Sequence, residues 1–156
     1  MPVKPAIIPC LRYEDAPAAI DFLCRASGFE RHAVDANAAD PTRIDHAQLV
    51  REGQMIMLSS VADSDHTPAA PMTTAAKAGG NTQAPYLVLD DVDGHAARAQ
   101  AEGADIFMQP ADQDYGGRNY SARDLEGNVS IAKRWQLIPT TSATPTCSNE
   151  VARCWR

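Results

Sequence analysis

The most constraining feature of this sequence is an internal repeat. Residues 6–15, AIIPCLRYED, match residues 84–93, APYLVLDDVD, because each is an apolar stretch that contains a proline and ends in acidic residues. Three later landmarks, a helix start, a helix end and a turn, recur at similar spacings: 13 and 25 residues separate Asp15, Gly28 and Gly53, and 12 and 24 residues separate Asp91, Gly103 and Gly127. A repeat of this kind predicts two copies of one structural unit that pack together.

Each copy begins with a strand that leads into a helix. Asp15 is placed to cap the first helix, Pro17 falls in its first turn, and Gly28 suits the left-handed position at its end. The second copy follows the same plan from Asp91 to Gly103. Both segments carry apolar residues at the spacing of a helix with one buried face.

Each helix is followed by a strand and then by a hairpin. The first hairpin, within RIDHAQLVREGQMIMLSS, turns at Glu52 and Gly53, and the second, within RNYSARDLEGNVSIAKRW, turns at residues 125–128. Gly, Asn and acidic residues between two apolar runs are typical of such turns. Each copy is therefore predicted to be a βαβββ module, and the fold class to be α+β.

The predicted domain organisation follows from the repeat. One domain of residues 1–138 contains module one, at about 4–60, and module two, at about 84–136. Residues 61–83 hold prolines and glycines without an apolar period, which predicts a connecting segment, with a lid over a ligand site as the alternative. Residues 139–156 are predicted to form a polar C-terminal tail.

Charge and cysteine usage limit the partners. A net charge of −6 without a basic run argues against nucleic acid and anionic membranes and favours a small-molecule ligand that is neutral or cationic. No apolar run is long enough to cross a bilayer or to act as a signal sequence, so we expect a cytoplasmic protein. The four cysteines show neither zinc spacing nor a disulfide framework, so they are expected to be reduced.

Three segments resemble the vicinal-oxygen-chelate superfamily, which includes glyoxalase I, extradiol dioxygenases, fosfomycin-resistance enzymes and bleomycin-resistance proteins. They are IIPCLRYEDAPAAIDFL, HAQLVREGQMIML and DYGGRNYSARDLEGNVS, and the resemblance covers about residues 4–136. It implies that each module curls its mixed sheet into half of a cupped, partly closed barrel with the helices outside. Taken alone, D-x-E-G-N is a turn in which Gly127 and Asn128 are expected to supply positive φ angles.

The resemblance also implies where a metal would bind. In metal-dependent members, His, Glu or Gln ligands lie on the first and last strands of the modules. The matching positions here are all apolar: Ile8, Met57, Ala84 and Ile131. Because an apolar side chain cannot replace water in a metal's coordination shell, we expect neither a metal nor another cofactor, and no catalytic residue is assigned.

Without a metal, the cup is predicted to be an apolar and partly aromatic ligand pocket. Strand alternation assigns its walls to Ile8, Cys10, Met55, Met57, Tyr86, Val88, Tyr120, Ala122, Val129 and Ile131. Its further contacts are expected from His46, Arg12, Tyr115, Arg118 and Trp135; the alternative is a structural or solvent-facing role for His46 and a surface position for each of the other four. The alternative is that the wall side chains only fill the core. His95 is expected on the solvent side of the second helix.

Two functions therefore stay open. The first is a metal-independent binding protein of the bleomycin-resistance type, which sequesters an apolar or aromatic molecule; the resemblance implies a homodimer whose clefts are shaped by both chains. The second is a divalent-metal enzyme, either a glyoxalase-like lyase or isomerase or a ring-cleaving dioxygenase. Metal content separates the two, because the fold alone hosts both.

Overall fold

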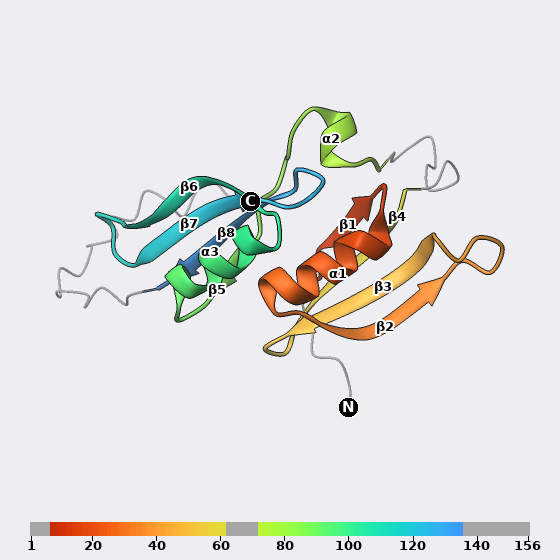
Figure 1. Cartoon of the computed structure of the whole chain (residues 1–156), viewed down its shortest axis with the longest axis horizontal. Helices are drawn as coiled ribbons and strands as arrows, with labels where there is room; N and C mark the ends of the chain where they lie inside the picture. The colour runs from red at the N-terminus through yellow and green to blue at the C-terminus, as the bar shows by residue number, and fades with distance from the viewer. Residues whose placement is uncertain (1–6, 62–71, 136–156) are drawn as a thin grey trace, which may run out of the picture.

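The computed structural model describes residues 7–61 and 72–135, which fold into two βαβββ modules (Figure 1). Module one consists of β1 (Cys10–Tyr13), α1 (Ala16–Ser27), β2 (Glu30–Ala36), β3 (Ile44–Arg51) and β4 (Gln54–Ser60). Module two repeats this order with β5 (Tyr86–Val88), α3 (Val92–Ala101), β6 (Asp105–Asp112), β7 (Arg118–Arg123) and β8 (Val129–Arg134). A short helix, α2 (Ala75–Ala78), lies between them. The α+β class and the two-module plan are confirmed.

Each module forms its own four-stranded mixed sheet, in the orders β1-β4-β3-β2 and β5-β8-β7-β6. The first strand pairs parallel to the last strand of its module, and the other pairs are antiparallel. Equivalent backbone hydrogen bonds join the parallel pairs: Met57 N donates to Pro9 O at 2.9 Å, and Ile131 N donates to Pro85 O at 3.0 Å. The repeat in the sequence is therefore also a repeat of backbone hydrogen bonding.

The helices α1 and α3 begin directly after Asp15 and Asp91, as the sequence predicts. The Asp15 side chain accepts from Ala18 N at 3.0 Å at the start of α1, and the Asp91 side chain accepts from Gly94 N at 2.9 Å at the start of α3. Gly28 ends α1 with a φ of 72°, a left-handed conformation that favours glycine. These three roles were predicted and are confirmed.

Each helix covers one face of its own sheet (Figure 1). Beneath α1, Tyr13, Leu49 and Leu58 are buried, and Tyr120 and Ala132 are buried in module two. The two helices also contact each other, so that the cores of the modules join on the helix side. Burial of these apolar side chains is the main force that holds each helix on its sheet.

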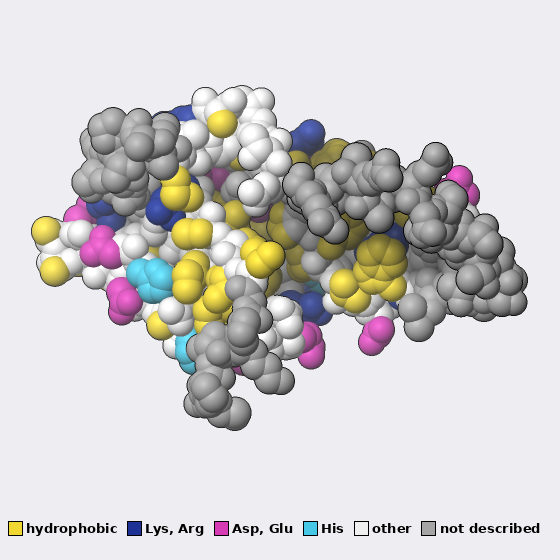
Figure 2. Space-filling model, turned by 180° about the vertical axis from the view of Figure 1, so that it is seen from behind, with side chains coloured by type: hydrophobic (Ala, Val, Ile, Leu, Met, Phe, Trp, Pro, Cys, Tyr) yellow, Lys and Arg dark blue, Asp and Glu magenta, His cyan; other side chains and the backbone are white. Residues whose placement is uncertain are grey.

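The opposite face of each sheet carries no helix, and we call it the open face. Both open faces are turned to the same side of the molecule, where hydrophobic side chains gather over both modules (Figure 2). In the described part of the chain, the two sheets lie beside one another without hydrogen bonds between their strands, so they do not close into a barrel. A ligand on one open face therefore does not meet the open face of the other module.

The turn of residues 124–128 in module two holds module one. Asp124 accepts from Asn128 N at 2.8 Å within the turn, and also from the Tyr13 hydroxyl at 2.7 Å. Glu126 accepts from the backbone N–H groups of Glu14 and Asp15, both at 2.8 Å, just before α1. Burial, and then the charge of Asp124, raise the pKa of Tyr13 well above its ordinary value, so this hydroxyl keeps its proton.

The described part of the connecting segment is tied to both modules. Lys77 of α2 forms an ion pair with Glu14, with 2.9 Å between Nζ and Oε1. The Asn81 amide donates to Gly127 O at 2.7 Å and accepts from Val129 N at 3.2 Å. Residues 62–71, which belong to the alternative of a lid, and the tail of residues 139–156 lie outside the described residues.

Two expectations about single residues were wrong. His95 is 5 % exposed and packs against the sheet, rather than facing solvent, because it follows Val92 at helical spacing on the buried face of α3. In the turn of module two, Gly127 has a φ of 84° but Asn128 does not have a positive φ; the non-glycine residue that does, among those described, is Glu52.

No helix among the described residues is long and apolar enough to cross a membrane.

Candidate ligand-binding site

The open face of module two presents an uncovered apolar surface. Tyr86 and Val88 alternate along β5, and their side chains are 54 % and 57 % exposed. Trp135, directly after β8, is 56 % exposed, and its ring lies 6.5 Å from the Tyr86 ring, centroid to centroid, with the planes 30° apart. Ile131 pairs with Tyr86 across the strands and is half-buried. This surface can stack against a planar molecule.

The open face of module one is apolar with a few polar groups. Cys10 on β1 pairs with Met57 on β4, and Met55 follows the same face. His46 lies on the neighbouring strand, where its ring nitrogen is 3.1 Å from the Gln48 amide nitrogen. Ile8 lies just before β1. The structure thus brings the predicted residues of module one together on one face.

Two predicted pocket residues lie elsewhere. Tyr120 is on the helix face of β7, where its hydroxyl is 2.6 Å from His95 Nδ1, and Ala122 shares that face. Burial raises the pKa of Tyr120 to about 12. The five-residue turn 124–128 explains this, because it pairs Tyr120 with Ala132 and Ser121 with Ile131, so the odd-numbered residues of β7 share the open face with Ile131.

Arg118 is occupied within the protein. Its guanidinium donates twice to the Asp93 carboxylate of α3, at 2.8 Å each, and lies 3.4 Å from Asp112. The first of these contacts raises the pKa of Arg118 and lowers the pKa of Asp93. Arg118 therefore joins β7 to α3.

Tyr115, another of the predicted rim residues, does lie beside the open face, next to Lys133.

Lys133 is a site residue that the sequence reasoning missed. It is 2 % exposed, and its Nζ lies 4.4 Å from the centroid of the Tyr115 ring and 4.0 Å from that of Trp135. Asn119, directly across the strands, is 7 % exposed, and its Oδ1 has no hydrogen-bond partner within the part of the chain that the structure describes. Alternation along β8 could have found Lys133, because it is two residues after Ile131.

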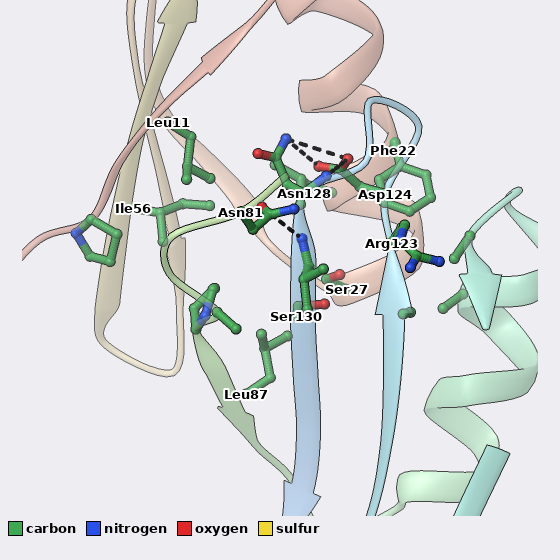
Figure 3. A pocket seen from close by; sticks show the side chains of 18 of the residues that line it. Leu11, Phe22, Ser27, Ile56, Asn81, Leu87, Arg123, Asp124, Asn128 and Ser130 are labelled. Atoms are coloured by element: carbon green, nitrogen blue, oxygen red, sulfur yellow. Dashed lines mark hydrogen bonds between the residues drawn. The ribbon is translucent and has the colours of Figure 1, made fainter. Parts of the chain in front are cut away.

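A separate cavity lies in the seam between the modules, on the helix side (Figure 3). Its volume is about 210 Å³, and most of its wall is apolar side chains from both modules, including Leu11, Phe22, Ile56 and Leu87. Asn81 closes one side through its hydrogen bond with Val129. Ligand pockets are typically about 300–1,000 Å³. We therefore regard this cavity as a gap in inter-module packing and the open faces as the candidate site.

The four positions at which the family resemblance implies metal ligands lie on or just before the paired first and last strands of the modules. Met57 and Ile131 lie opposite Cys10 and Tyr86, and Ile8 and Ala84 lie just before the same two strands. Within residues 7–61 and 72–135, no three His, Cys, Asp or Glu side chains are grouped closely enough to hold a metal ion. The side chains at these four positions therefore offer no imidazole or carboxylate to a divalent metal.

Comparison with known proteins places this architecture. The sequence profile of the Glyoxalase/Bleomycin resistance protein/Dioxygenase superfamily matches residues 7–130. No curated protein sequence matches the chain. Among solved structures, TioX from Micromonospora sp. ML1 is 28 % identical, with 85 % of this chain and 100 % of that chain covered and a TM-score of 0.63.

Two further structures share the fold. Protein PA1353 from Pseudomonas aeruginosa is 21 % identical over 85 % of this chain and 99 % of that chain, with a TM-score of 0.64. The fosfomycin resistance protein FosX from Listeria monocytogenes is 12 % identical over 86 % of this chain and 96 % of that chain, also with a TM-score of 0.64. Since the profile matches residues 7–130, which include all of module one and module two as far as the start of β8, the chain belongs to the Glyoxalase/Bleomycin resistance protein/Dioxygenase superfamily.

Proposed function

We propose that this protein binds an apolar or aromatic organic molecule on its open faces, without a metal ion, and protects by sequestering that molecule. The proposed site is a cup closed by two copies of the chain. Its walls include Cys10, Met57, Tyr86, Val88 and Trp135. The protein acts in the cytoplasm, where thiols such as that of Cys10 stay reduced.

The observation that carries this proposal is the exposed aromatic and aliphatic surface of module two. Tyr86, Val88 and Trp135 are each more than half exposed and lie next to one another. Large apolar side chains that are contiguous at a surface mark a binding site for a ligand or a partner. Tyr and Trp rings supply contact area at a low cost in conformational entropy.

A second copy of the chain would supply the opposite side of the ligand pocket. The two sheets of one chain lie side by side, and their open faces point the same way, so neither can close over a ligand held by the other (Figure 2). Ligand pockets usually bury 70–90 % or more of the ligand surface. A twofold-related copy would bring one module of each chain face to face across the ligand, which is the arrangement that we propose for the homodimer.

The donor chemistry favours binding over metal catalysis. Ile8, Met57, Ala84 and Ile131 offer no imidazole or carboxylate, and substrates of the metal-dependent members require an ion there. FosX, which has the same fold, is a fosfomycin resistance protein by its name. The proposed protective role agrees with what is known of a protein with this fold. The proposal is nevertheless based on the apolar open faces of this chain and not on its similarity to FosX, because one fold can have many functions.

Metal content and ligand stabilisation together test the proposal. The full chain is purified without chelators, and bound metal is measured by mass spectrometry. Less than about 0.1 divalent ion per chain is expected, whereas one tightly bound ion per chain would contradict metal-independent binding.

The same preparation is then screened by thermal unfolding against divalent metals and against planar aromatic compounds. A molecule that binds only the folded protein raises the melting temperature, and at 100 times its Kd it stabilises by about 2.7 kcal/mol. Stabilisation by aromatic compounds, reduced by Tyr86→Ala, is expected. Stabilisation by metals alone would overturn the proposal.

A further inference from the structure

The open face of module two contains a buried cation. The Lys133 side chain is 2 % exposed, and the rings of Tyr115 and Trp135 lie over its ammonium at 4.4 and 4.0 Å. Aromatic rings attract a cation through their negative faces. They do not neutralise it, because a ring carries no net charge. A buried ammonium without an anion is therefore in an unfavourable position.

No acidic side chain among the described residues forms an ion pair with this lysine. Three carboxylates of module two pair with arginines instead: Asp93 and Asp112 contact Arg118, and Asp105 contacts Arg123 at 2.8 Å. The overall charge of −6 favours a neutral or cationic ligand, whereas the buried Lys133 adds a positive charge at this place on the face. Within residues 7–61 and 72–135, the Lys133 ammonium therefore lies on an apolar face without an acidic partner.

A second polar group lies directly beside the lysine. Asn119 pairs with Lys133 across β7 and β8, so their side chains stand next to each other on the same face. Only 7 % of Asn119 is exposed, and its Oδ1 accepts no hydrogen bond within residues 7–61 and 72–135. Buried side-chain amides normally form hydrogen bonds. If the Asn119 amide is rotated so that its oxygen and nitrogen exchange places, its NH2 group stands where Oδ1 is now.

The surroundings of this polar pair are flat and apolar. Val88 lies opposite Lys133 on β5, and Tyr86 with the Trp135 ring extends the same surface. An aromatic ring can stack on this surface while a substituent reaches the ammonium. A carboxylate suits the polar end, since it offers one oxygen to each of the two groups. A phosphate would bring a second negative charge, which the single charge of Lys133 does not neutralise.

We propose that Lys133 and Asn119 bind the carboxylate of an aromatic acid whose ring stacks on Tyr86 and Trp135. This inference rests on the proposed function, because it names the class of ligand that the same site would hold. The ammonium forms a charge-assisted hydrogen bond to one carboxylate oxygen, and the turned Asn119 amide donates to the other. Tyr115, which covers the lysine from a loop, moves aside or packs on the ligand.

Three probes of one shape and different charge test this assignment. They are 2-naphthoate, 2-naphthamide and 2-naphthylmethylammonium, titrated into the full chain at neutral pH by calorimetry. Naphthoate is expected to bind about tenfold or more tightly than naphthamide, since a hydrogen bond to a charged group is the difference between them. Equal affinities for these two, or tightest binding of the ammonium probe, would overturn the assignment while leaving the proposed function intact.

Substitutions locate the effect at the lysine. Lys133→Met keeps the length and apolar packing of the side chain, and should remove the preference for naphthoate without changing naphthamide binding. Lys133→Arg should retain the preference, and Asn119→Leu should weaken naphthoate binding alone. Lys77→Met is the matched control, because it removes the other described lysine, which belongs to α2 and pairs with Glu14.

The remaining outcomes are also decisive. A Lys133→Met protein that binds naphthoate as the native protein does would contradict the assignment. If this variant does not fold, the native protein decides: its affinity for naphthoate, but not for naphthamide, must fall as salt is raised. Failure of all three probes to bind would count against the proposed function itself and not only against the acid.

Discussion

His95 shows how one buried polar side chain makes the fold depend on pH. Its ring is buried between α3 and β7, and its Nδ1 is 2.6 Å from the Tyr120 hydroxyl. Burial, and then the positive charges of Arg98 and Arg51, lower the pKa of His95 to about 4 from an ordinary 6.5. The unfolded chain therefore takes up a proton near pH 6.5, and the folded protein does so only near pH 4.

Stability is expected to fall as the pH drops through this window, because the unfolded state then binds more protons than the folded state. Between about pH 7.5 and about pH 5 the contribution of His95 should decrease by about 2 kcal/mol. His95→Gln removes the titration and can still bond to Tyr120, so this variant should lack that part of the loss in urea unfolding. His32→Gln, at an exposed histidine, should behave as the native protein, and a His95→Gln protein with the native pH profile would contradict this account.

Gly117 places the loop that carries Tyr115. It has a φ of 81°, and a Cβ added there would stand 2.2 Å from the carbonyl oxygen of Arg134. Gly117→Ala should therefore lower the free energy of unfolding by about 3 kcal/mol or more. Gly127→Ala is the matched control: its φ is 84° and nothing lies within 4 Å, so a loss of about 1–2 kcal/mol is expected. Equal losses in chemical unfolding would show that the clash is relieved.

The sequence predicted the strand face correctly for some of the site residues and not for others. Alternation placed Tyr86, Val88 and Ile131 on one strand face, and the structure agrees. It misplaced Tyr120, because the face of β7 depends on the length of the turn before β8, which alternation alone does not give. Lys133 was missed because a lysine in a strand is expected in solvent.

At the scale of elements, the turn 124–128 shows how a local motif becomes a long-range contact. The turn is specified by its own residues, since the Asp124 carboxylate accepts hydrogen bonds from Glu126 N and Asn128 N. The side chain of Glu126, however, accepts from two N–H groups that precede α1. An acidic group is favourable at this end of a helix, where the dipole is positive.

Replacing Glu126 by Gln should destabilise the protein by about 1–3 kcal/mol, because the amide turns an NH2 group toward one of the two donors. Urea unfolding at neutral pH measures this loss. Glu30→Gln, at an exposed position of β2, makes the same chemical change and should alter stability by less than about 0.5 kcal/mol. A similar result for the two variants would show that this contact between modules contributes nothing.

The elements were more predictable than their contacts. Caps and turn residues act within a few positions, so Asp15, Gly28, Asp91 and the Glu52–Gly53 turn could be recognised in the sequence. The first strands proved shorter than their apolar stretches: β1 has four residues and β5 has three. Their length is set by the parallel partner, which comes much later in the chain.

At the scale of the whole molecule, the side-by-side sheets leave two open faces for association. Sedimentation velocity of the native protein is expected to show a dimer, because a second copy of the chain would cover these apolar faces. A stable interface of this kind buries about 1,000 Å² or more. Val88→Asp would place a charge on the open face and should raise the dimer Kd at least about tenfold. Val34→Asp, on β2 away from that face, is the control. A native monomer at micromolar concentration would contradict the shared cup.

The position of Glu126 in the chain has a consequence for synthesis. A ribosome adds Glu14 112 residues before Glu126, which at about 5–20 residues per second is an interval of roughly 6–22 s. During that interval the start of α1 lacks its acceptors and Tyr13 lacks Asp124. A nascent chain that stops before residue 124 would therefore hold an unfinished first module, and we expect such truncated products to be degraded rather than to accumulate.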